Sequence, residues 1–569
     1  MMKNMEVAWL FDQTADLMEI AGDDAYRVRA YRQASRSIAD LDEDIETLYQ
    51  QRRLQEIPGI GKELGKKIGE ILTTGSFSFY DRLREKVPAG LVIMLELPGL
   101  GPKSVRSIYQ GLGITSLEEL EQAAREKKIR GLPGMGSKTE LGILRGIEML
   151  KGRGGRVPIG LALPLGEEMR SYLAGLPEVQ GVEFAGSLRR WKDLVGDIDL
   201  VASVAETDWE KVLGGFAQHP RIKKVLEADP QRALVQTVLG VNIELIVVSP
   251  REFFLTVFRD TGSKAHWSAL ERYAADRRPD FSVGGCSSVS EFEKMVYLSL
   301  GLEYIVPELR EDRGEIDAAA SGTLPALVEV SDLRGDLHLH TDWSDGVNQL
   351  EVMVDAARRR GYEYIAITEH SKFLTISRGL TEERLLQQVE AIGKINRENP
   401  GLRVLTGIEV DILGDGQLDL PDHVLAEVDL VIASIHSGFR QEPERITRRL
   451  LAALENPNVD IVAHPTGRML ARREPYAFDL ELVMRTAVQT RTALEINASP
   501  DRLDLNDEHA RRFTEMGGVL AINTDAHDCR RLDDIRFGVM TARRGWVSAD
   551  RVINAWPLDK LLEWLNRGD

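Results

Sequence analysis

Histidine and acidic residues recur where apolar runs end in the C-terminal part of the chain. Six of the ten histidines of the protein lie at such positions. Nine imidazole and carboxylate donors are too many for one tetrahedral zinc ion and suit two or three divalent ions of the Mn, Zn or Fe type. Clustered ions lower the pKa of a bound water and polarise a phosphoester, so the set predicts a multi-metal phosphoesterase. The candidate ligands are His338, His340, Asp345, His370, Glu409, His436, His464, Asp525 and His527.

Each of these residues, taken singly, also has an ordinary interpretation. The ends of barrel strands are normally polar, so a residue such as His464 serves equally well as a hydrogen-bonded strand cap. The whole set is hard to explain in that way, because nearly every run would need the same coincidence. The other histidines lack this placement, and we interpret them as surface or structural residues. They are His219, His266, His423 and His509.

The runs that carry these donors indicate how they are positioned. Seven apolar runs, most of them separated by helical segments, follow one another as DLHLH, YIAITEH, VLTGIEVDI, LVIASIH, DIVAHP, ALEINAS and VLAINTDAH. This alternation predicts a barrel of parallel strands, in which the active site lies where the strands end. His338 and His340 are two residues apart and therefore point to the same side of their strand.

A second chemical motif is the segment GSLRRWKDLVGDIDLV, residues 186–201. Asp197 and Asp199 present two carboxylates on one face of a strand, which suits two Mg ions in phosphoryl transfer. Gly186 and Ser187 open a turn before a helix, with Arg190 in reach of a triphosphate. A GDID turn alone is unremarkable. Joined to GSxRR at this spacing, it indicates a nucleotidyltransferase.

Three glycine-rich turns punctuate the helical N-terminal part, in residues 57–72, 97–114 and 132–148. None follows a strand or ends in GK[ST], which argues against a dinucleotide site or P-loop. They are either helix punctuation in a small bundle or repeated helix-hairpin-helix motifs, whose backbone N–H groups bind DNA phosphates without sequence preference. The candidate DNA contacts are Gly59, Gly61, Lys62, Lys66, Gly99, Gly101, Lys103, Gly134, Gly136 and Lys138.

Length and composition constrain the class of protein. The 569 residues are enough for three or four domains. There is no uninterrupted apolar run of about 18 residues and no signal peptide, so we expect a cytoplasmic protein without a membrane segment. Cys286 and Cys529 match no zinc or redox spacing. The net charge of −18 argues mildly against a protein that coats nucleic acid, but local Lys and Arg can still bind DNA.

Changes in pattern predict a multidomain α/β protein with four segments. Residues 1–150 form a helical helix-hairpin-helix domain, and residues 151–310 an α+β nucleotidyltransferase core with palm and fingers. A linker covers 311–334, and residues 335–569 form the barrel. The Gly-, Pro- and base-containing stretch 151–160 is interpreted as a flexible hinge.

Residues 335–565 resemble a PHP domain, the polymerase and histidinol phosphatase family of trinuclear phosphoesterases. All nine positions of its metal motif are matched by the donors named above. Glu369 departs from the Asp that the family commonly has before the histidine, but it is not one of the nine.

The whole chain resembles bacterial family X DNA polymerases of the PolX type. TGSK (261–264) and YIVPELREDRGEIDAA (304–319) look like the fingers segment and the junction of that family. The resemblance implies gap-filling synthesis on gapped or nicked DNA from dNTPs with Mg or Mn, together with a 3′ to 5′ exonuclease in the PHP domain. It also implies nucleotide contacts at Gly196 and Gly262, and a protein associated with the bacterial nucleoid.

Four residues depart from the polymerase pattern. Glu244 stands where the family has its third catalytic Asp, and the extra methylene can misplace the carboxylate. Errors of about 1 Å can cost on the order of 100-fold in rate. Arg259 and Asp260 replace Tyr and Phe near the nucleotide sugar, and Trp267 replaces an Asn. Together they suggest reduced or lost synthesis.

Lys67 resembles the Schiff-base lysine of relatives with deoxyribose-phosphate lyase activity. The adjacent Lys66 can lower its pKa by charge repulsion. The alternative is a solvated phosphate contact.

Three hypotheses remain open at this point. The first is a DNA repair enzyme with polymerase and exonuclease activities. The second makes residues 1–310 an inactive DNA-binding module that delivers substrate to the nuclease. The third is a small-molecule phosphatase of the histidinol phosphate kind, against which the three hairpins argue.

Overall fold

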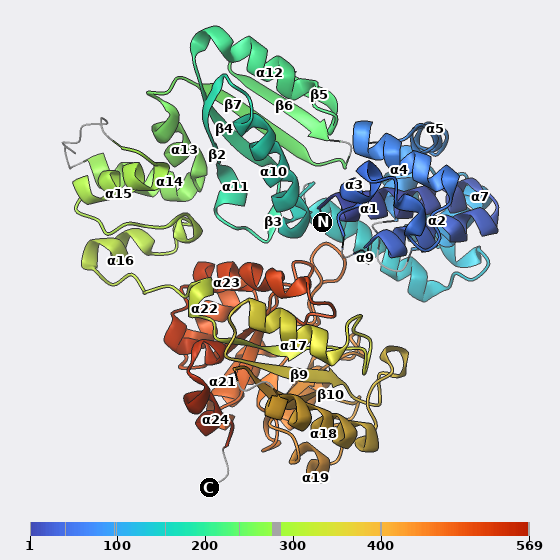
Figure 1. Cartoon of the computed structure of the whole chain (residues 1–569), viewed down its shortest axis with the longest axis vertical. Helices are drawn as coiled ribbons and strands as arrows, with labels where there is room; N and C mark the ends of the chain where they lie inside the picture. The colour runs from blue at the N-terminus through green and yellow to red at the C-terminus, as the bar shows by residue number, and fades with distance from the viewer. Residues whose placement is uncertain are drawn as a thin grey trace. The chain divides into compact units, whose positions relative to one another are not determined.

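The computed structural model describes residues 2–566 except 40, 42, 75, 96, 98, 99, 154, 238, 276–285, 399 and 400. Figure 1 labels its elements along the chain. No described helix is long and apolar enough to cross a membrane.

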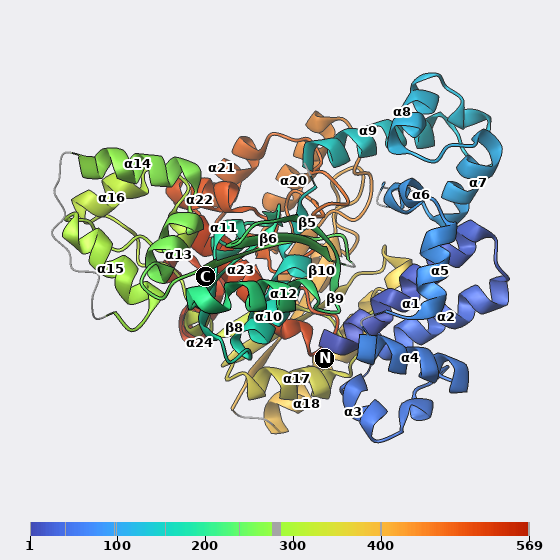
Figure 2. The ribbon, with the colours of Figure 1, turned by 90° about the horizontal axis from the view of Figure 1, so that it is seen from above.

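The N-terminal part consists of helices and loops, drawn in blue and cyan in Figure 2. Its three glycine-rich turns lie directly before α4, α7 and α9. Gly59 and Gly134 have φ angles of 83° and 75°, a conformation that glycine adopts without strain. Buried side chains such as Phe11, Ile68 and Val105 share one core. The helices are α1 (Met2–Ala21), α2 (Ala25–Ala39), α3 (Ile45–Gln50), α4 (Lys62–Thr74), α5 (Ser78–Lys86), α6 (Ala89–Met94), α7 (Pro102–Leu112), α8 (Leu117–Arg125) and α9 (Ser137–Arg153).

The middle part mixes strands with helices, as expected for an α+β core. Strands β5, β6 and β7 form an antiparallel ladder in which Leu234 pairs with Glu244. Strand β2 is a neighbour of β4. The elements are β1 (Val157–Pro158), α10 (Ile159–Ala174), β2 (Val179–Phe184), α11 (Gly186–Arg189), β3 (Leu194–Val195), β4 (Ile198–Val204), α12 (Trp209–Ala217), β5 (Ile222–Ala228), β6 (Arg232–Thr237) and β7 (Asn242–Val248).

Four helices follow these strands and enclose a buried ion pair. The guanidinium of Arg310 is fully buried, lies over the rings of Phe258 and Tyr297, and donates to both carboxylate oxygens of Glu293 at 2.9 and 2.8 Å. A buried charge needs such pairing to offset its lost hydration. The helices are α13 (Phe253–Thr261), α14 (Lys264–Ala275), α15 (Val289–Ser299) and α16 (Glu315–Ser321).

Two segments that we expected to be linkers contain helix. Helix α9 continues to Arg153, and α10 begins at Ile159, so much of the expected hinge is helical. Helix α16 lies inside the expected linker 311–334. Its run of alanines favours helix, and its buried Glu315 lies 2.6 Å from Nδ1 of His266. That buried pair anchors a segment that composition alone makes look flexible.

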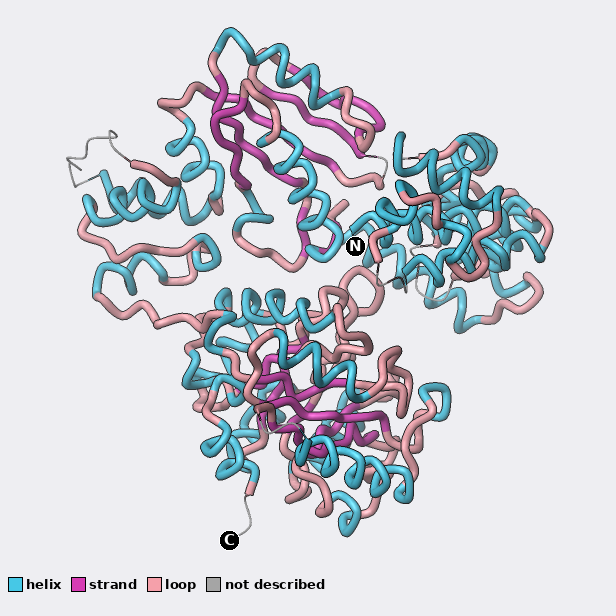
Figure 3. Tube along the Cα trace, viewed as in Figure 1, coloured by secondary structure: helices cyan, strands magenta, loops and turns pink. Residues whose placement is uncertain are grey.

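The C-terminal part has a seven-stranded parallel sheet in the order β8 to β14, which confirms the predicted barrel. Closure is almost complete, because Leu339 forms a parallel bridge with Ala526. Figure 3 shows these strands surrounded by helices. Every residue of β8, β9, β11 and β13 is buried, as in parallel strands covered on both faces. The strands are β8 (Gly335–Leu339), β9 (Tyr364–His370), β10 (Arg403–Asp411), β11 (Leu430–Ser434), β12 (Ile461–Val462), β13 (Ala493–Asn497) and β14 (Leu520–Asn523).

The helices of this part supply the outer layer. Apolar strand residues such as Val431 and Ile496 share a core with Leu450, Val483 and Phe513 of the helices. The helices are α17 (Leu350–Arg359), α18 (Glu382–Glu398), α19 (Asp422–Leu425), α20 (Pro443–Leu454), α21 (Leu480–Thr490), α22 (Asp507–Glu515), α23 (Ile535–Arg544) and α24 (Leu558–Leu565).

Candidate functional site

All nine candidate metal ligands lie at or just beyond the carboxyl ends of barrel strands. His338 lies near the end of β8 and His340 directly follows it, while His370 is the last residue of β9. Glu409 lies near the end of β10, and His436 follows β11 by two residues. The remaining ligands occupy the loops after β8, β12 and β14, namely Asp345, His464, Asp525 and His527. Because parallel strands end at one edge, the fold brings together residues far apart in sequence.

The carboxylate of Glu409 lies within 4.0 Å of five imidazole rings, of which that of His340 is the most distant, at 3.7 Å from Nε2. Its oxygens are 2.7 Å from Nδ1 of His370 and 3.1 Å from Nε2 of His464. They are also 3.4 Å from Nε2 of His436 and 3.5 Å from Nε2 of His338. A carboxylate placed in this way would serve as a metal ligand together with these imidazoles.

Asp345 and Asp525 complete the cluster. Nε2 of His340 lies 3.2 Å from Asp525, and Nε2 of His527 lies 3.4 Å from Asp345. Eight of the nine residues fall into three groups whose donor atoms lie within 4.8 Å of one another. The groups are His340 with Asp345, His370 and His527, then His338 with His340 and Asp525, then His370 with Glu409 and His436.

Several buried donor atoms in the cluster have no hydrogen-bond partner among the described residues. They are Nε2 of His338, both ring nitrogens of His340, Nδ1 of His370 and Oε2 of Glu409. Leaving such an atom unsatisfied costs about 1–3 kcal/mol. Divalent cations would satisfy these atoms together, so the residues present fit a metal centre with His and carboxylate ligands.

Electrostatics favour the ligand forms of two central side chains. Burial alone would raise the pKa of Glu409, but His436, His370 and His338 hold it well below its usual range. Burial, with the neighbouring His527 and His370, lowers the pKa of His340 to about 3. An ionised carboxylate and a neutral imidazole are the states that bind metals.

Glu495, on β13, contacts two of the candidate ligands and is absent from the set that the sequence predicts. Its carboxylate lies 2.8 Å from Nδ1 of His338 and accepts the backbone N–H of His464 at 2.8 Å. Asn523 donates to it at 3.0 Å. By fixing Nδ1 of His338, Glu495 turns Nε2 toward the cluster. A signal for Glu495 is present in the sequence: ALEINAS is the one strand-like run that carries none of the nine candidate ligands.

Glu369, which departs from the PHP pattern, is held by hydroxyl and amide groups. It is fully buried and accepts hydrogen bonds from Ser344, from the backbone and side chain of Thr341, and from Gln388. One of its carboxylate oxygens lies 4.0 Å from Nδ1 of the candidate ligand His340. The longer side chain therefore braces the loop after β8 from outside the nine-residue set.

In the nucleotidyltransferase motif, the carboxylate of Asp199 lies against the backbone of Gly186. Gly186 begins α11 with a φ of 56°, and a Cβ there would lie 1.6 Å from Oδ2 of Asp199. Only glycine is compatible with this close approach. Asp197 directly precedes β4, following Gly196, and Asp199 lies within the strand.

The arginines of GSLRR are already bound to protein groups. Arg190 is buried, donates to the carbonyl oxygen of Thr261, and lies 3.1 Å from Glu311. Arg189 lies 2.6 Å from the buried Glu293. A Cβ at Gly262 would come within 3.3 Å of Nη1 of Arg190. The structure thus brings Arg190 and Gly262 together, with the Arg190 side chain engaged by Glu311.

The four residues of the core that depart from the polymerase pattern also contact neighbouring side chains. Arg232, on the neighbouring strand, donates to the carboxylate of Glu244. Arg259 lies 2.7 Å from Asp260 in an exposed ion pair. Trp267 packs edge-to-face on Phe258 with 5.6 Å between ring centroids. These pairs give each departure a local structural role.

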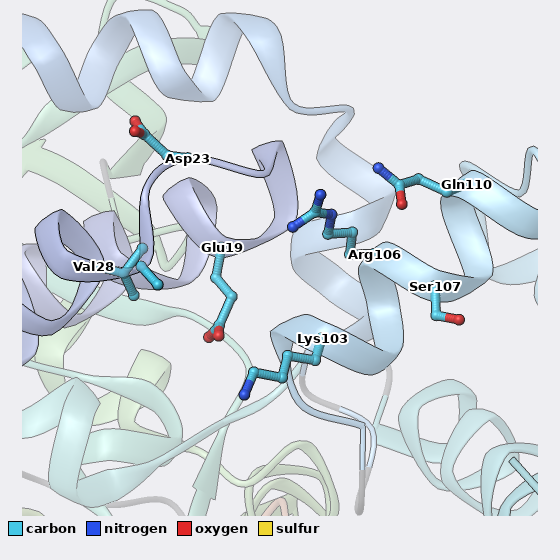
Figure 4. A pocket seen from close by; sticks show the side chains of 8 residues that line it. Glu19, Asp23, Val28, Lys103, Arg106, Ser107 and Gln110 are labelled. Carbon is cyan, nitrogen blue, oxygen red and sulfur yellow. The ribbon is translucent and has the colours of Figure 1, made fainter. Parts of the chain in front are cut away.

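The lysines of the first two hairpins lie at the surface. Lys62 and Lys66 are exposed at the start of α4, and Lys66 pairs with Glu63 at 3.0 Å. Lys103 and Arg106, from α7, line a pocket of about 370 Å³ (Figure 4). Gly99 lies outside the described residues, as does the side chain of Lys138.

Lys67 has a different environment from Lys66. Its Nζ donates to the hydroxyl of Tyr31 at 2.5 Å and lies 5.1 Å from the ring centroid of Phe79. Burial, together with the charge of Arg27, lowers its pKa. A half-buried lysine between aromatic rings is more readily deprotonated than a solvated one.

Comparison with known proteins covers all parts of the chain. A helix-hairpin-helix domain family matches residues 2–77, a SAM-like helix-hairpin-helix tandem family matches 92–148, and the PHP domain family matches 336–499. The chain is 38% identical to the DNA polymerase/3′-5′ exonuclease PolX of Bacillus subtilis, over 100% of both proteins. It is 27% identical to a probable phosphatase of Syntrophotalea carbinolica, over 40% of this chain and 95% of that protein. A probable phosphatase of Caldanaerobacter subterraneus is 30% identical over 34% and 76%.

Proposed function

The chain belongs to the PolX family, and from this premise we propose that it is a DNA repair enzyme combining a metal-dependent 3′-5′ exonuclease with a gap-filling DNA polymerase. Gapped or nicked DNA of the bacterial nucleoid is the proposed substrate, with dNTPs for synthesis. The 38% identity to the Bacillus subtilis protein over the full length of both chains supports both activities. The helix-hairpin-helix matches support binding of the DNA backbone by the N-terminal part.

The observation that carries the exonuclease is the set of buried donor atoms without partners around Glu409. Three groups of donors support a centre of two or three ions, for which we propose Mn, Zn or Fe. Mg or Mn is proposed for the Asp197 and Asp199 pair.

The residues of the chain prepare the hydrolytic site in defined ways. Divalent ions held by these residues would supply an activated water and would neutralise charge on the phosphodiester. Glu495 holds the His338 ring in one orientation, and Asp411, 3.3 Å from Nδ1, does the same for His436. His338, His340 and Glu409 are almost fully buried, so the field at the reacting phosphate is little screened by water.

A second candidate function is a nuclease whose polymerase core is weak and serves to hold DNA. The Arg232 to Glu244 pair favours it, because it draws the candidate catalytic carboxylate toward a neighbouring cation. The engagement of Arg190 by Glu311 favours it as well, because a triphosphate would have to displace that contact.

Lyase chemistry at Lys67 is supported by its lowered pKa and its aromatic surroundings. A neutral amine is the form that attacks an aldehyde. We expect borohydride to trap the protein on DNA with a 5′-deoxyribose phosphate. Trapping should be lost in Lys67→Ala and kept in Lys66→Ala, and equal trapping by both variants would refute this role.

The proposal is tested with a labelled primer on gapped DNA, in Mn or Mg, with and without dNTPs. Extension that disappears in Asp197→Ala supports the polymerase. Shortening that survives Asp197→Ala but disappears in His436→Ala supports a nuclease in the barrel. If neither product forms while histidinol phosphate is hydrolysed, the proposal is wrong.

A further inference from the structure

Arg502 lies beside the metal cluster without being part of it. It follows β13 in the loop that leads to α22, at the barrel edge where the ligands gather. Its Nε is 3.7 Å from Oδ2 of Asp525, a candidate metal ligand. In the described part of the chain no other carboxylate lies within 4.0 Å of its guanidinium, and no group hydrogen-bonds to it. Its side chain is 20% exposed.

A largely buried guanidinium normally has acceptors for its five N–H groups. Two other arginines of the barrel follow that rule in part: the Nε atom of each has no partner, but their other nitrogens contact protein acceptors. Arg449 donates to the carbonyl oxygen of Ser437 at 2.9 Å, and Arg468 lies 3.0 Å from Asp193. Asp525 cannot fully serve Arg502, because its other oxygen lies 3.2 Å from Nε2 of His340 and its charge belongs to the metal set. Arg502 therefore has donors available for an anion at the cluster.

We infer that Arg502 is a catalytic residue that binds the scissile phosphate beside the metal centre. Planar guanidinium groups bind phosphate through two parallel hydrogen bonds, and such donors gain strength as negative charge develops on the phosphoryl oxygens. This inference rests on the proposed phosphodiesterase function of the barrel.

The test uses the full-length protein and the p-nitrophenyl ester of thymidine 5′-monophosphate, a phosphodiester with one phosphate. For Arg502→Ala we expect kcat/KM to fall by about 100-fold, as for loss of one preorganised donor to a developing oxyanion. Arg502→Lys should recover part of the loss, because it keeps the charge but not the two-pronged geometry. Arg472→Ala is the control, because Arg472 is 66% exposed and its charged partner, 3.9 Å away, is Asp501 and not a candidate ligand.

A binding measurement separates this inference from the proposed function. Calorimetry with thymidine 5′-monophosphate should give weaker binding for Arg502→Ala than for wild type, with unchanged metal content by mass spectrometry. Wild-type affinity and rate in Arg502→Ala would overturn the inference. So would loss of metal together with activity, because Arg502 would then only support Asp525. If wild type fails to cleave the ester, the proposed function fails, while the nucleotide affinities still report on Arg502.

Discussion

Charged groups have different partners in the two candidate sites, the metal centre of the barrel and the nucleotidyltransferase motif of the middle part. In the barrel, buried imidazole and carboxylate atoms face one another without hydrogen-bond partners among the described residues. In the middle part, Glu244, Arg190 and Arg259 each contact an oppositely charged protein group. Unsatisfied buried donors are costly and therefore indicate a site shaped for an ion. Paired groups must exchange a partner before they can bind a substrate.

The largest effect should come from removing the charge shared by the metal ligands. Glu409→Gln keeps the shape of the side chain but removes a carboxylate close to five imidazoles. We expect loss of metal and a fall in exonuclease rate of more than about 100-fold, measured as shortening of a labelled primer. Glu363→Gln, at the barrel surface and 47% exposed, is the control and should retain full activity. If Glu409→Gln shortens the primer at the wild-type rate, the contrast between the barrel and the middle part is wrong.

A smaller loss is expected at Glu495. Glu495→Gln keeps a hydrogen bond to His338 but removes the charge that fixes the ring, so exonuclease rate or metal affinity should fall by about 10- to 100-fold. Metal titration with a competing chelator measures the affinity. Unchanged affinity and rate in this variant would show that the ring is oriented by other contacts.

A gain of activity, not a loss, is expected for one substitution in the middle part. Glu244→Asp shortens the side chain that Arg232 holds and restores the residue typical of the family. Correcting a displacement of about 1 Å can recover part of a 100-fold loss, so we expect primer extension to rise by about tenfold. Shortening of the primer by the exonuclease activity proposed for the barrel should not change. An extension rate that falls would show that the Arg232 pair supports catalysis.

The smallest effect is expected at a single hairpin lysine. Lys62→Ala should weaken binding of gapped DNA only a few-fold and reduce the salt dependence of log K by about 0.9, because one phosphate contact is lost. Fluorescence anisotropy at several salt concentrations measures both. Lys394→Ala, on the barrel and 71% exposed, is the control and should leave the slope unchanged. An identical slope in both variants would remove Lys62 from the DNA-binding surface.

The barrel and its ligand ends could be predicted from sequence, because parallel strands buried on both faces give continuous apolar runs and the ligands follow each run directly. Glu495 was missed, since its importance lies in a contact with His338, 157 residues away. The pairing of Glu244 with Arg232 was equally hidden, because it depends on strand register. Composition predicts a linker where helix α16 lies, because the contact of Glu315 with His266 on another helix cannot be seen in the sequence.

The most direct test of the central claim is anomalous diffraction from crystals of the full-length protein grown with Mn. The account predicts two or three strong peaks among the nine ligands, with one beside Glu409, and their loss in Glu409→Gln. Peaks elsewhere with none among these residues would contradict it.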